Sequence, residues 1–143
     1  MSNELHGYYI EDISEGMTAG YAKTITEADV VLFAGISGDD NPVHINEEFA
    51  VETMFKGRIV HGMFCAALIS TVVGTRLPGP GCIYVDQSLK FKAPVRIGDT
   101  VNVTATVKSV DRERRRVQLD TVCTVKGKTV TEGVATMMVD RRS

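Results

Sequence analysis

Residues 63–73 read MFCAALISTVV, and this stretch restricts the possible folds more than any other part of the sequence. Only Ser70 and Thr71 interrupt its apolar side chains, so a helix built from it has no polar face. A helix that is apolar all round is a buried one, and the stretch is well short of the roughly 20 residues that span a bilayer. The sequence therefore predicts a helix inside the protein. Gly74 and the turn at residues 77–81 end it.

After this helix the hydrophobic pattern changes to the period of two that is typical of half-buried strands. Residues 101–107 and 117–123 alternate in this way, with a charged turn at 111–114 between them. Further strands are expected at 17–24, at 83–91 and at 129–139, the last one after the tight turn at 126–128. Helical and strand-like halves that do not alternate indicate an α+β fold. The expected architecture is about five mostly antiparallel strands curled around one buried helix.

The first half of the chain carries two further helix signals. Thr26 and Asp29 have the spacing of a helix N-cap and its partner, and Gly38 is placed to stop that helix. Asn46 is a candidate cap for a second short helix that extends to about residue 54.

Length and charge narrow the functional classes. The chain has 143 residues, which predicts a single domain spanning 1–143. Its formal net charge of −2 argues against nucleic acid as a partner. The three cysteines include no C-x-x-C pair and predict buried thiols in a reducing compartment. The acidic N-terminus lacks a long apolar core, so we expect no signal peptide, no membrane span and a cytoplasmic location.

Reactive side chains are concentrated at residues 37–44, SGDDNPVH. Pro42 stiffens the backbone between two carboxylates and His44, and such a pair can hold a water molecule and move its protons. The alternative is that Asp39 or Asp40 caps a turn and His44 only forms a structural hydrogen bond. Metal binding by His44, His61 and an aspartate is not supported by the usual ligand spacing, so no metal is expected.

Gly62 follows His61 at the start of the buried helix. Backbone N–H groups at a helix N-terminus carry partial positive charge, and a glycine allows an oxygen atom to approach closely. Gly62 is therefore a candidate oxyanion donor. The alternative is that this glycine only permits tight packing of the turn.

Four segments together resemble the MaoC-like hydratase family: SGDDNPVHIN, RIVHGM, the buried helix, and PGPGCIYVDQSLKFKAPVRIGDTV. The resemblance is to the short (R)-specific enoyl-CoA hydratases and extends from about residue 16 to residue 139. The family motif is an aspartate, a variable residue, Asn-Pro, a variable residue and a histidine, which corresponds here to residues 39–44. It implies a hotdog fold, in which a curved antiparallel sheet wraps around one long central helix. It also implies a homodimer with the two sheets joined edge to edge.

The resemblance assigns roles residue by residue. Asp39 and His44 correspond to the catalytic pair, and Gly62 to the oxyanion donor. Asn41 is expected to orient the motif loop, Ser70 to lie near the site, and His61 to shape a turn. The implied reaction is reversible syn addition of water to a trans-2-enoyl-CoA, which gives an (R)-3-hydroxyacyl-CoA without a cofactor beyond the CoA of the substrate. The implied setting is fatty acid metabolism, including the supply of polyhydroxyalkanoate precursors.

Several alternatives remain open from the sequence. The same pair could dehydrate another acyl thioester, either a hydroxyacyl-acyl-carrier-protein or a branched acyl-CoA, and hotdog folds also include acyl-CoA thioesterases. A non-catalytic acyl-CoA-binding subunit would not need both Asp39 and His44.

Two further points concern single residues. Asn46 stands where relatives often have an aspartate. The CoA phosphates could be held by the basic cluster at 112–116 or by basic residues nearer the motifs, namely Lys56, Arg58, Lys90 and Lys92.

Overall fold

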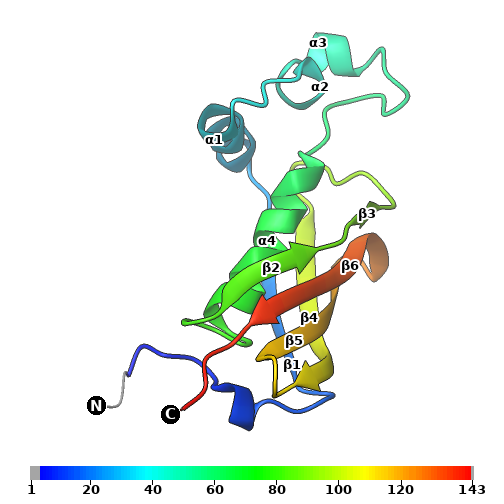
Figure 1. The fold of residues 1–143 in the computed structure, drawn as a ribbon. Helices are drawn as coiled ribbons and strands as arrows, with labels where there is room; N and C mark the ends of the chain where they lie inside the picture. The colour runs from blue at the N-terminus through cyan, green and yellow to red at the C-terminus, as the bar shows by residue number, and fades with distance from the viewer. Residues whose placement is uncertain (1–3, 143) are drawn as a thin grey trace.

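The computed structural model describes residues 4–142 and shows one antiparallel sheet of six strands with a long helix against it (Figure 1). The strand order is β1-β4-β5-β6-β2, and β3 also pairs with β6. The strands are β1 (Thr18–Thr24), β2 (Ile83–Gln87), β3 (Lys90–Phe91), β4 (Thr100–Asp111), β5 (Arg116–Val125) and β6 (Lys128–Met138). The expected α+β hotdog architecture is confirmed. The first three residues and the last residue of the expected domain lie outside the described range.

The long helix is α4 (Gly62–Thr75), and one side of it forms the centre of the core. Phe64, Leu68 and Val72 belong to one buried cluster with the inward-facing residues of the sheet. Strand β4 contributes to this cluster with one of its two faces, because its buried and exposed residues alternate along most of its length. The period of two in the sequence therefore places one face of the sheet on the helix.

The expectation that the central helix is buried on most sides is wrong for the single chain. Met63 is 56% exposed, and Ala67 and Ser70 are exposed on the same side of α4. The sheet covers one side of the helix only, so the apolar stretch has more hydrophobic surface than its own sheet can bury. In the described part of the chain, no helix is long and apolar enough to cross a membrane.

The expected strand over 83–91 is interrupted. Strand β2 ends at Gln87 and β3 begins at Lys90, and both pair with β6. At the break, the Ser88 hydroxyl accepts a hydrogen bond from the Val134 backbone N–H at 2.9 Å, and the Gln87 side chain donates to the Ser88 carbonyl at 2.8 Å. These side-chain bonds supplement the backbone bond that the Ser88 N–H donates to the Val134 carbonyl at 3.0 Å, which an alternation pattern does not reveal.

A segment with three helices projects beyond one end of the sheet, at the end opposite the termini (Figure 1). These helices are α1 (Glu27–Ser37), α2 (Pro42–Ile45) and α3 (Glu47–Ala50). The expected ends of α1 are confirmed: Thr26 and Asp29 form a reciprocal capping box, and Gly38 ends the helix at a φ of 80°. Helix α3 is shorter than expected, and its cap Asn46 also ends α2.

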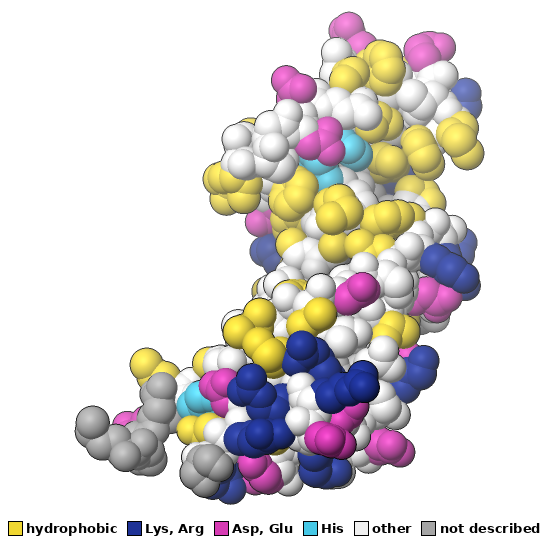
Figure 2. All heavy atoms as spheres, in the orientation of Figure 1, with side chains coloured by type: hydrophobic (Ala, Val, Ile, Leu, Met, Phe, Trp, Pro, Cys, Tyr) yellow, Lys and Arg dark blue, Asp and Glu magenta, His cyan; other side chains and the backbone are white. Residues whose placement is uncertain are grey.

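A short 3-10 turn, η1 (Ile10–Asp12), packs at the opposite end of the molecule. Hydrophobic side chains gather on the face shown in Figure 2 over the projecting segment, whereas Lys and Arg side chains gather near the termini. The two ends of the molecule therefore differ in surface chemistry.

Candidate active site

Asp39 lies in a short loop between α1 and α2 that is held by local hydrogen bonds. The Ser37 hydroxyl donates to the Phe33 carbonyl at 2.6 Å and accepts from the Asp39 backbone N–H at 3.1 Å. The Asp39 carboxylate accepts from the Asn41 N–H at 3.3 Å. An aspartate that bonds the backbone two residues further on forms a compact turn. The carboxylate is fixed in place while remaining accessible to solvent.

Asn41 caps α2, because its side-chain oxygen accepts from the Val43 N–H at 3.2 Å. Pro42 occupies the first position of this helix, where a missing N–H costs no hydrogen bond. This turn of helix carries His44 into the interior. The resemblance implies that Asn41 orients the motif loop. This role stays a prediction, and it is supported by the N-cap hydrogen bond between Asn41 and Val43.

His44 is held in a single ring orientation. Its Nδ1 lies 2.8 Å from the carbonyl oxygen of Ile59, which can only accept, so Nδ1 carries the proton. The other nitrogen, Nε2, therefore has a free lone pair. The residue as a whole is 8% exposed. A buried, oriented imidazole with one free nitrogen is suited to accept a proton from a bound molecule.

Arg58 also contributes to the position of His44, and the sequence contains no signal for this role. Its Nε donates to the His44 carbonyl at 2.6 Å, and its two terminal nitrogens donate to the Glu27 carboxylate at 2.8 and 2.9 Å. One guanidinium therefore joins α1 to α2. Because Arg58 is committed to these partners, we do not assign it to the CoA phosphates.

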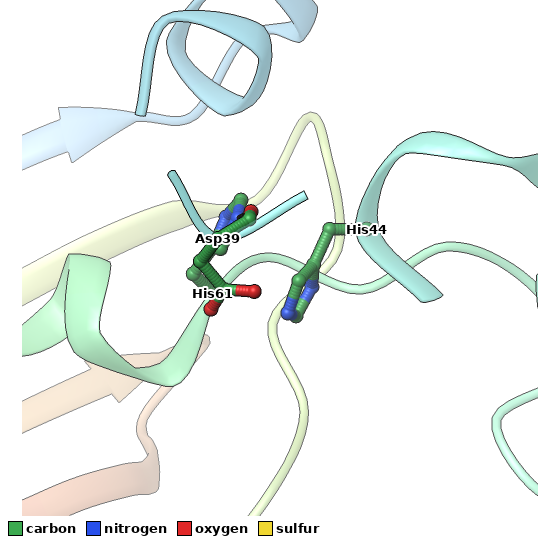
Figure 3. Close-up of side chains that lie close together, drawn as sticks. All are labelled: Asp39, His44 and His61. Atoms are coloured by element: carbon green, nitrogen blue, oxygen red, sulfur yellow. Dashed lines mark hydrogen bonds between the residues drawn. The ribbon is translucent and has the colours of Figure 1, made fainter. Parts of the chain in front are cut away.

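His61 contacts both members of the expected catalytic pair. Its Nε2 lies 2.9 Å from the backbone oxygen of Asp39, and its ring stacks on His44 with centroids 3.9 Å apart. In Figure 3 the Asp39 carboxylate and the His44 ring point toward one another. The three residues each have a polar atom within 4.8 Å of the others. The structure thus brings together Asp39 and His44 as expected, and adds His61.

These three residues are also the candidate metal ligands of the described chain. Their arrangement is unfavourable for a shared ion, because the two rings are stacked with an interplanar angle of 27°. Imidazole lone pairs lie in the ring planes, so stacked rings do not direct them at one point. In addition, one nitrogen of each ring faces a backbone carbonyl.

Gly62 begins α4 directly after His61, so its backbone N–H lies at the positive end of the helix and has no intrahelical acceptor. A Cβ atom at Gly62 would approach the Phe91 ring carbons to 2.9 Å. A side chain at position 62 would therefore force the Phe91 ring or the start of α4 to shift, and both interpretations of Gly62 stay predictions. A cleft of about 390 Å³ opens beside Gly62, and its lining includes Phe91 and Lys92.

Ser70 lies on the exposed side of α4, eight positions beyond Gly62, which is about 12 Å along a helix. Among the described residues, no hydrogen bond joins its side chain to Asp39 or His44. It shares its side of the helix with Met63 and Ala67, next to a shallow apolar groove of about 450 Å³. The role of Ser70 near the site stays a prediction.

Burial lowers the pKa of His44 from its usual value, because a charged imidazole is poorly solvated there. The Ile59 carbonyl, and to a smaller extent Asp39, counteract part of this effect, whereas His61 adds to it. The lowered pKa favours the neutral form of His44, which is the form that accepts a proton.

Residues 11–134 match the model of the MaoC like domain. The chain belongs to this family. It is 59% identical over 141 residues to the (R)-specific enoyl-CoA hydratase of Rhodospirillum rubrum, covering 99% of this chain and 98% of that protein. It is 48% identical over 142 residues to the 3-hydroxybutyryl-CoA dehydratase of Methylorubrum extorquens, covering 99% and 90%.

The fold of this MaoC-like chain is similar to a solved (R)-hydratase from A. caviae involved in PHA biosynthesis. The TM-score is 0.87 at 36% identity, and the match covers 90% of this chain and 98% of the other. The likeness therefore extends over most of the fold. It supports the hotdog architecture that the hydrophobic pattern and the family resemblance predict.

Proposed function

We propose that this protein is an (R)-specific enoyl-CoA hydratase, a hydro-lyase that adds water reversibly to a trans-2-enoyl-CoA to give an (R)-3-hydroxyacyl-CoA. The observation that carries the proposal is the juxtaposition of Asp39 and His44 beside the start of α4. The high identity to a curated hydratase over nearly the whole chain supports the same reaction.

The proposed mechanism uses one water molecule held between Asp39 and His44. The β-carbon of an enoyl thioester becomes electrophilic when negative charge can collect on the thioester oxygen, and the Gly62 N–H would stabilise that charge. As the water oxygen attacks the β-carbon, the pair removes a proton from it, with neutral His44 as the group best prepared to accept. The protonated pair then donates a proton to the α-carbon from the same face, the charge on the thioester oxygen returns to the carbonyl, and the pair regains its starting protonation state. The net change is addition of H and OH across the double bond.

No metal or redox cofactor is part of this proposal, and the CoA enters as part of the substrate. The cleft beside Gly62 is the proposed place for the thioester end, because it adjoins both Gly62 and His61. Its lining is mainly apolar, and of the residues that the structure describes Lys92 is the one Lys, Arg, Asp or Glu side chain in it. This composition suits the uncharged arm of a CoA thioester.

The second candidate is dehydration of another 3-hydroxyacyl thioester. The identity to a 3-hydroxybutyryl-CoA dehydratase favours it, and that reaction is hydration in reverse at the same site. A thioesterase is less well supported, because Asp39 and His44 come from the Asp-x-Asn-Pro-x-His motif of the hydratases and lie within 4.8 Å of one another beside the start of α4.

Incubation with crotonyl-CoA tests the proposal through the loss of enoyl absorbance. We expect Asp39→Asn and His44→Gln each to lower kcat by roughly 10²–10⁴-fold, the usual contribution of a positioned acid or base. Asp40→Asn is the matched control, because Asp40 is the neighbouring exposed carboxylate at the variable motif position. Release of free thiol without hydration would contradict the hydratase and favour the thioesterase.

We also propose a cytoplasmic homodimer built from one domain per chain. Strand β2 lies at the edge of the sheet, and Ile83 and Val85 are 54% and 52% exposed. An unpaired apolar edge next to the uncovered side of α4 is the surface a second copy would cover.

The three free cysteines are consistent with a reducing compartment. The (R)-hydratase of A. caviae is involved in PHA biosynthesis, and a role in supplying polyhydroxyalkanoate precursors would match it.

A further inference from the structure

We propose that His61 is a positioning residue for the Asp39–His44 pair. It fixes the Asp39 backbone and the His44 ring relative to one another and does not itself exchange a proton. The inference rests on the proposed function for its kinetic test. It goes beyond the role of shaping a turn, because it gives His61 a specific effect on turnover.

The first support is the hydrogen bond from His61 to the Asp39 loop. The Asp39 carbonyl oxygen can only accept, so His61 Nε2, at 2.9 Å, carries the proton and donates it. Within residues 4–142, the other hydrogen bonds of Asp39 are to Ser37 and Asn41 of its own loop. The bond from His61 therefore sets where this loop lies relative to the start of α4.

The second support is the ring packing. The His61 ring stacks on His44 at 3.9 Å and meets the Phe33 ring at 4.8 Å with an angle of 52°. It therefore lies between α1 and α2 while its backbone belongs to the N-cap of α4. With Nδ1 of His44 held by the Ile59 carbonyl, this stack restricts the remaining tilt of the His44 ring.

The third support is that neither ring nitrogen of His61 is accessible for proton transfer. Nε2 is committed to Asp39, and Nδ1 is buried without a partner among the described residues. The residue as a whole is only 1% exposed. A buried ring nitrogen without a partner is destabilising, so its presence requires a reason. The donor at Nε2 supplies one, because a purely apolar ring could not make that bond.

Three substitutions separate the hydrogen bond from the ring. His61→Phe keeps a stackable ring and removes the donor. His61→Gln places an amide nitrogen near the position of Nε2 and removes the ring, whereas His61→Asn places its amide nitrogen near Nδ1, too far back to reach Asp39. His6→Phe is the control for a histidine-to-phenylalanine change at a distant site, since His6 bonds Asp140 near the C-terminus.

We expect His61→Phe to lower kcat for crotonyl-CoA by roughly 10–100-fold, the cost of a small misplacement of reacting groups. The KM should stay within about threefold, because the misplaced groups act on the bound substrate. His61→Asn, which lacks both the ring and the donor, should lose at least as much kcat as His61→Phe, and His61→Gln, which keeps the donor, should recover part of the lost kcat. The Tm of His61→Phe should be unchanged or raised, since the buried unpaired Nδ1 is gone.

A double-mutant cycle tests whether His61 acts through Asp39. If it does, Asp39→Asn combined with His61→Phe should lose no more kcat than Asp39→Asn alone. Losses that multiply would overturn the inference, as would full kcat in folded His61→Phe. A parallel fall of Tm and kcat in all three variants would also overturn it, because that pattern indicates a role in folding only.

An NMR measurement keeps the inference separate from the proposed function. The Asp40 amide shares its peptide group with the Asp39 carbonyl, so its ¹⁵N signal should move in His61→Phe and not in His6→Phe. If the wild-type protein hydrates no enoyl-CoA, the proposed function fails, and this signal alone decides whether His61 positions the loop. An unmoved Asp40 signal in His61→Phe would overturn the inference.

Discussion

At the scale of single residues, the chemistry of the site depends on which nitrogen of each histidine ring is hydrogen-bonded to a backbone carbonyl. His44 and His61 both face a backbone carbonyl, through Nδ1 and Nε2 respectively. The two rings are therefore left with different free nitrogens. His44 retains its outer nitrogen for a water molecule, whereas the free nitrogen of His61 is buried. The sequence motif predicted the importance of His44, but no motif specifies which carbonyl each ring meets.

The pH dependence of turnover follows from the environment of His44. Burial lowers its pKa, so the proton-accepting form persists below the usual value of about 6.5. We expect kcat/KM for crotonyl-CoA to be constant above about pH 6.5 and to fall as a single protonation at lower pH. In His44→Gln the residual rate should lack this acidic limb. An acidic limb centred above pH 7 in the wild-type protein would contradict the account.

The same shift affects stability with a defined sign. A histidine whose pKa is lowered on folding binds fewer protons in the native than in the unfolded chain. The free energy of unfolding should therefore fall as the pH drops from about 6.5 through the lowered pKa of His44. Denaturant unfolding of the wild-type protein and His44→Gln at several pH values measures this difference.

At the scale of elements, the start of α4 joins packing to chemistry. Gly62 supplies a backbone N–H at the positive end of the helix, and Phe91 from β3 packs where a side chain would otherwise be. The helix itself could be predicted from its apolar sequence, and α1 from its capping box and final glycine. The break between β2 and β3 was not predicted, because it involves long-range side-chain bonds from Gln87 to the Thr121 hydroxyl and from the Val134 N–H to Ser88.

Gly62→Ala tests this arrangement. The added methyl would lie 2.9 Å from the Phe91 ring, so the start of α4 or the ring must move. We expect a lower Tm and a kcat reduced by up to roughly 10²-fold, because displacement of the Gly62 N–H from the thioester oxygen approaches the effect of losing the donor. Adding Phe91→Ala should restore part of both, because the backbone N–H remains and the clash is relieved. Failure of the second change to restore any kcat would mean that the N–H is not the relevant group.

At the scale of the whole molecule, one chain leaves apolar surface uncovered on α4, β2 and the projecting helices. Met63 and Ile83 are each more than half exposed, although the hydrophobic pattern predicted burial of the central helix. Sequence periodicity reports that a surface is apolar, and it does not distinguish burial within a chain from burial between chains. The proposed homodimer accounts for the difference.

Ala67→Glu tests the homodimer. It places a carboxylate on the exposed side of α4, and glutamate is a good helix former, so the single chain should still fold. We expect a shift from dimer to monomer in size-exclusion chromatography with light scattering, together with reduced hydratase activity. Lys108→Glu, on an exposed position of β4, is the control and should stay dimeric. A monomeric wild-type protein would contradict the proposed assembly.

The most direct test of the central claim is the hydration of crotonyl-CoA by the wild-type protein, Asp39→Asn, His44→Gln and Asp40→Asn under identical conditions, with the configuration of the product determined. The account predicts (R)-3-hydroxybutyryl-CoA from the wild-type protein and from Asp40→Asn, and a kcat lower by roughly 10²–10⁴-fold in the other two variants. Full activity in both Asp39→Asn and His44→Gln, or product of the opposite configuration, would contradict it.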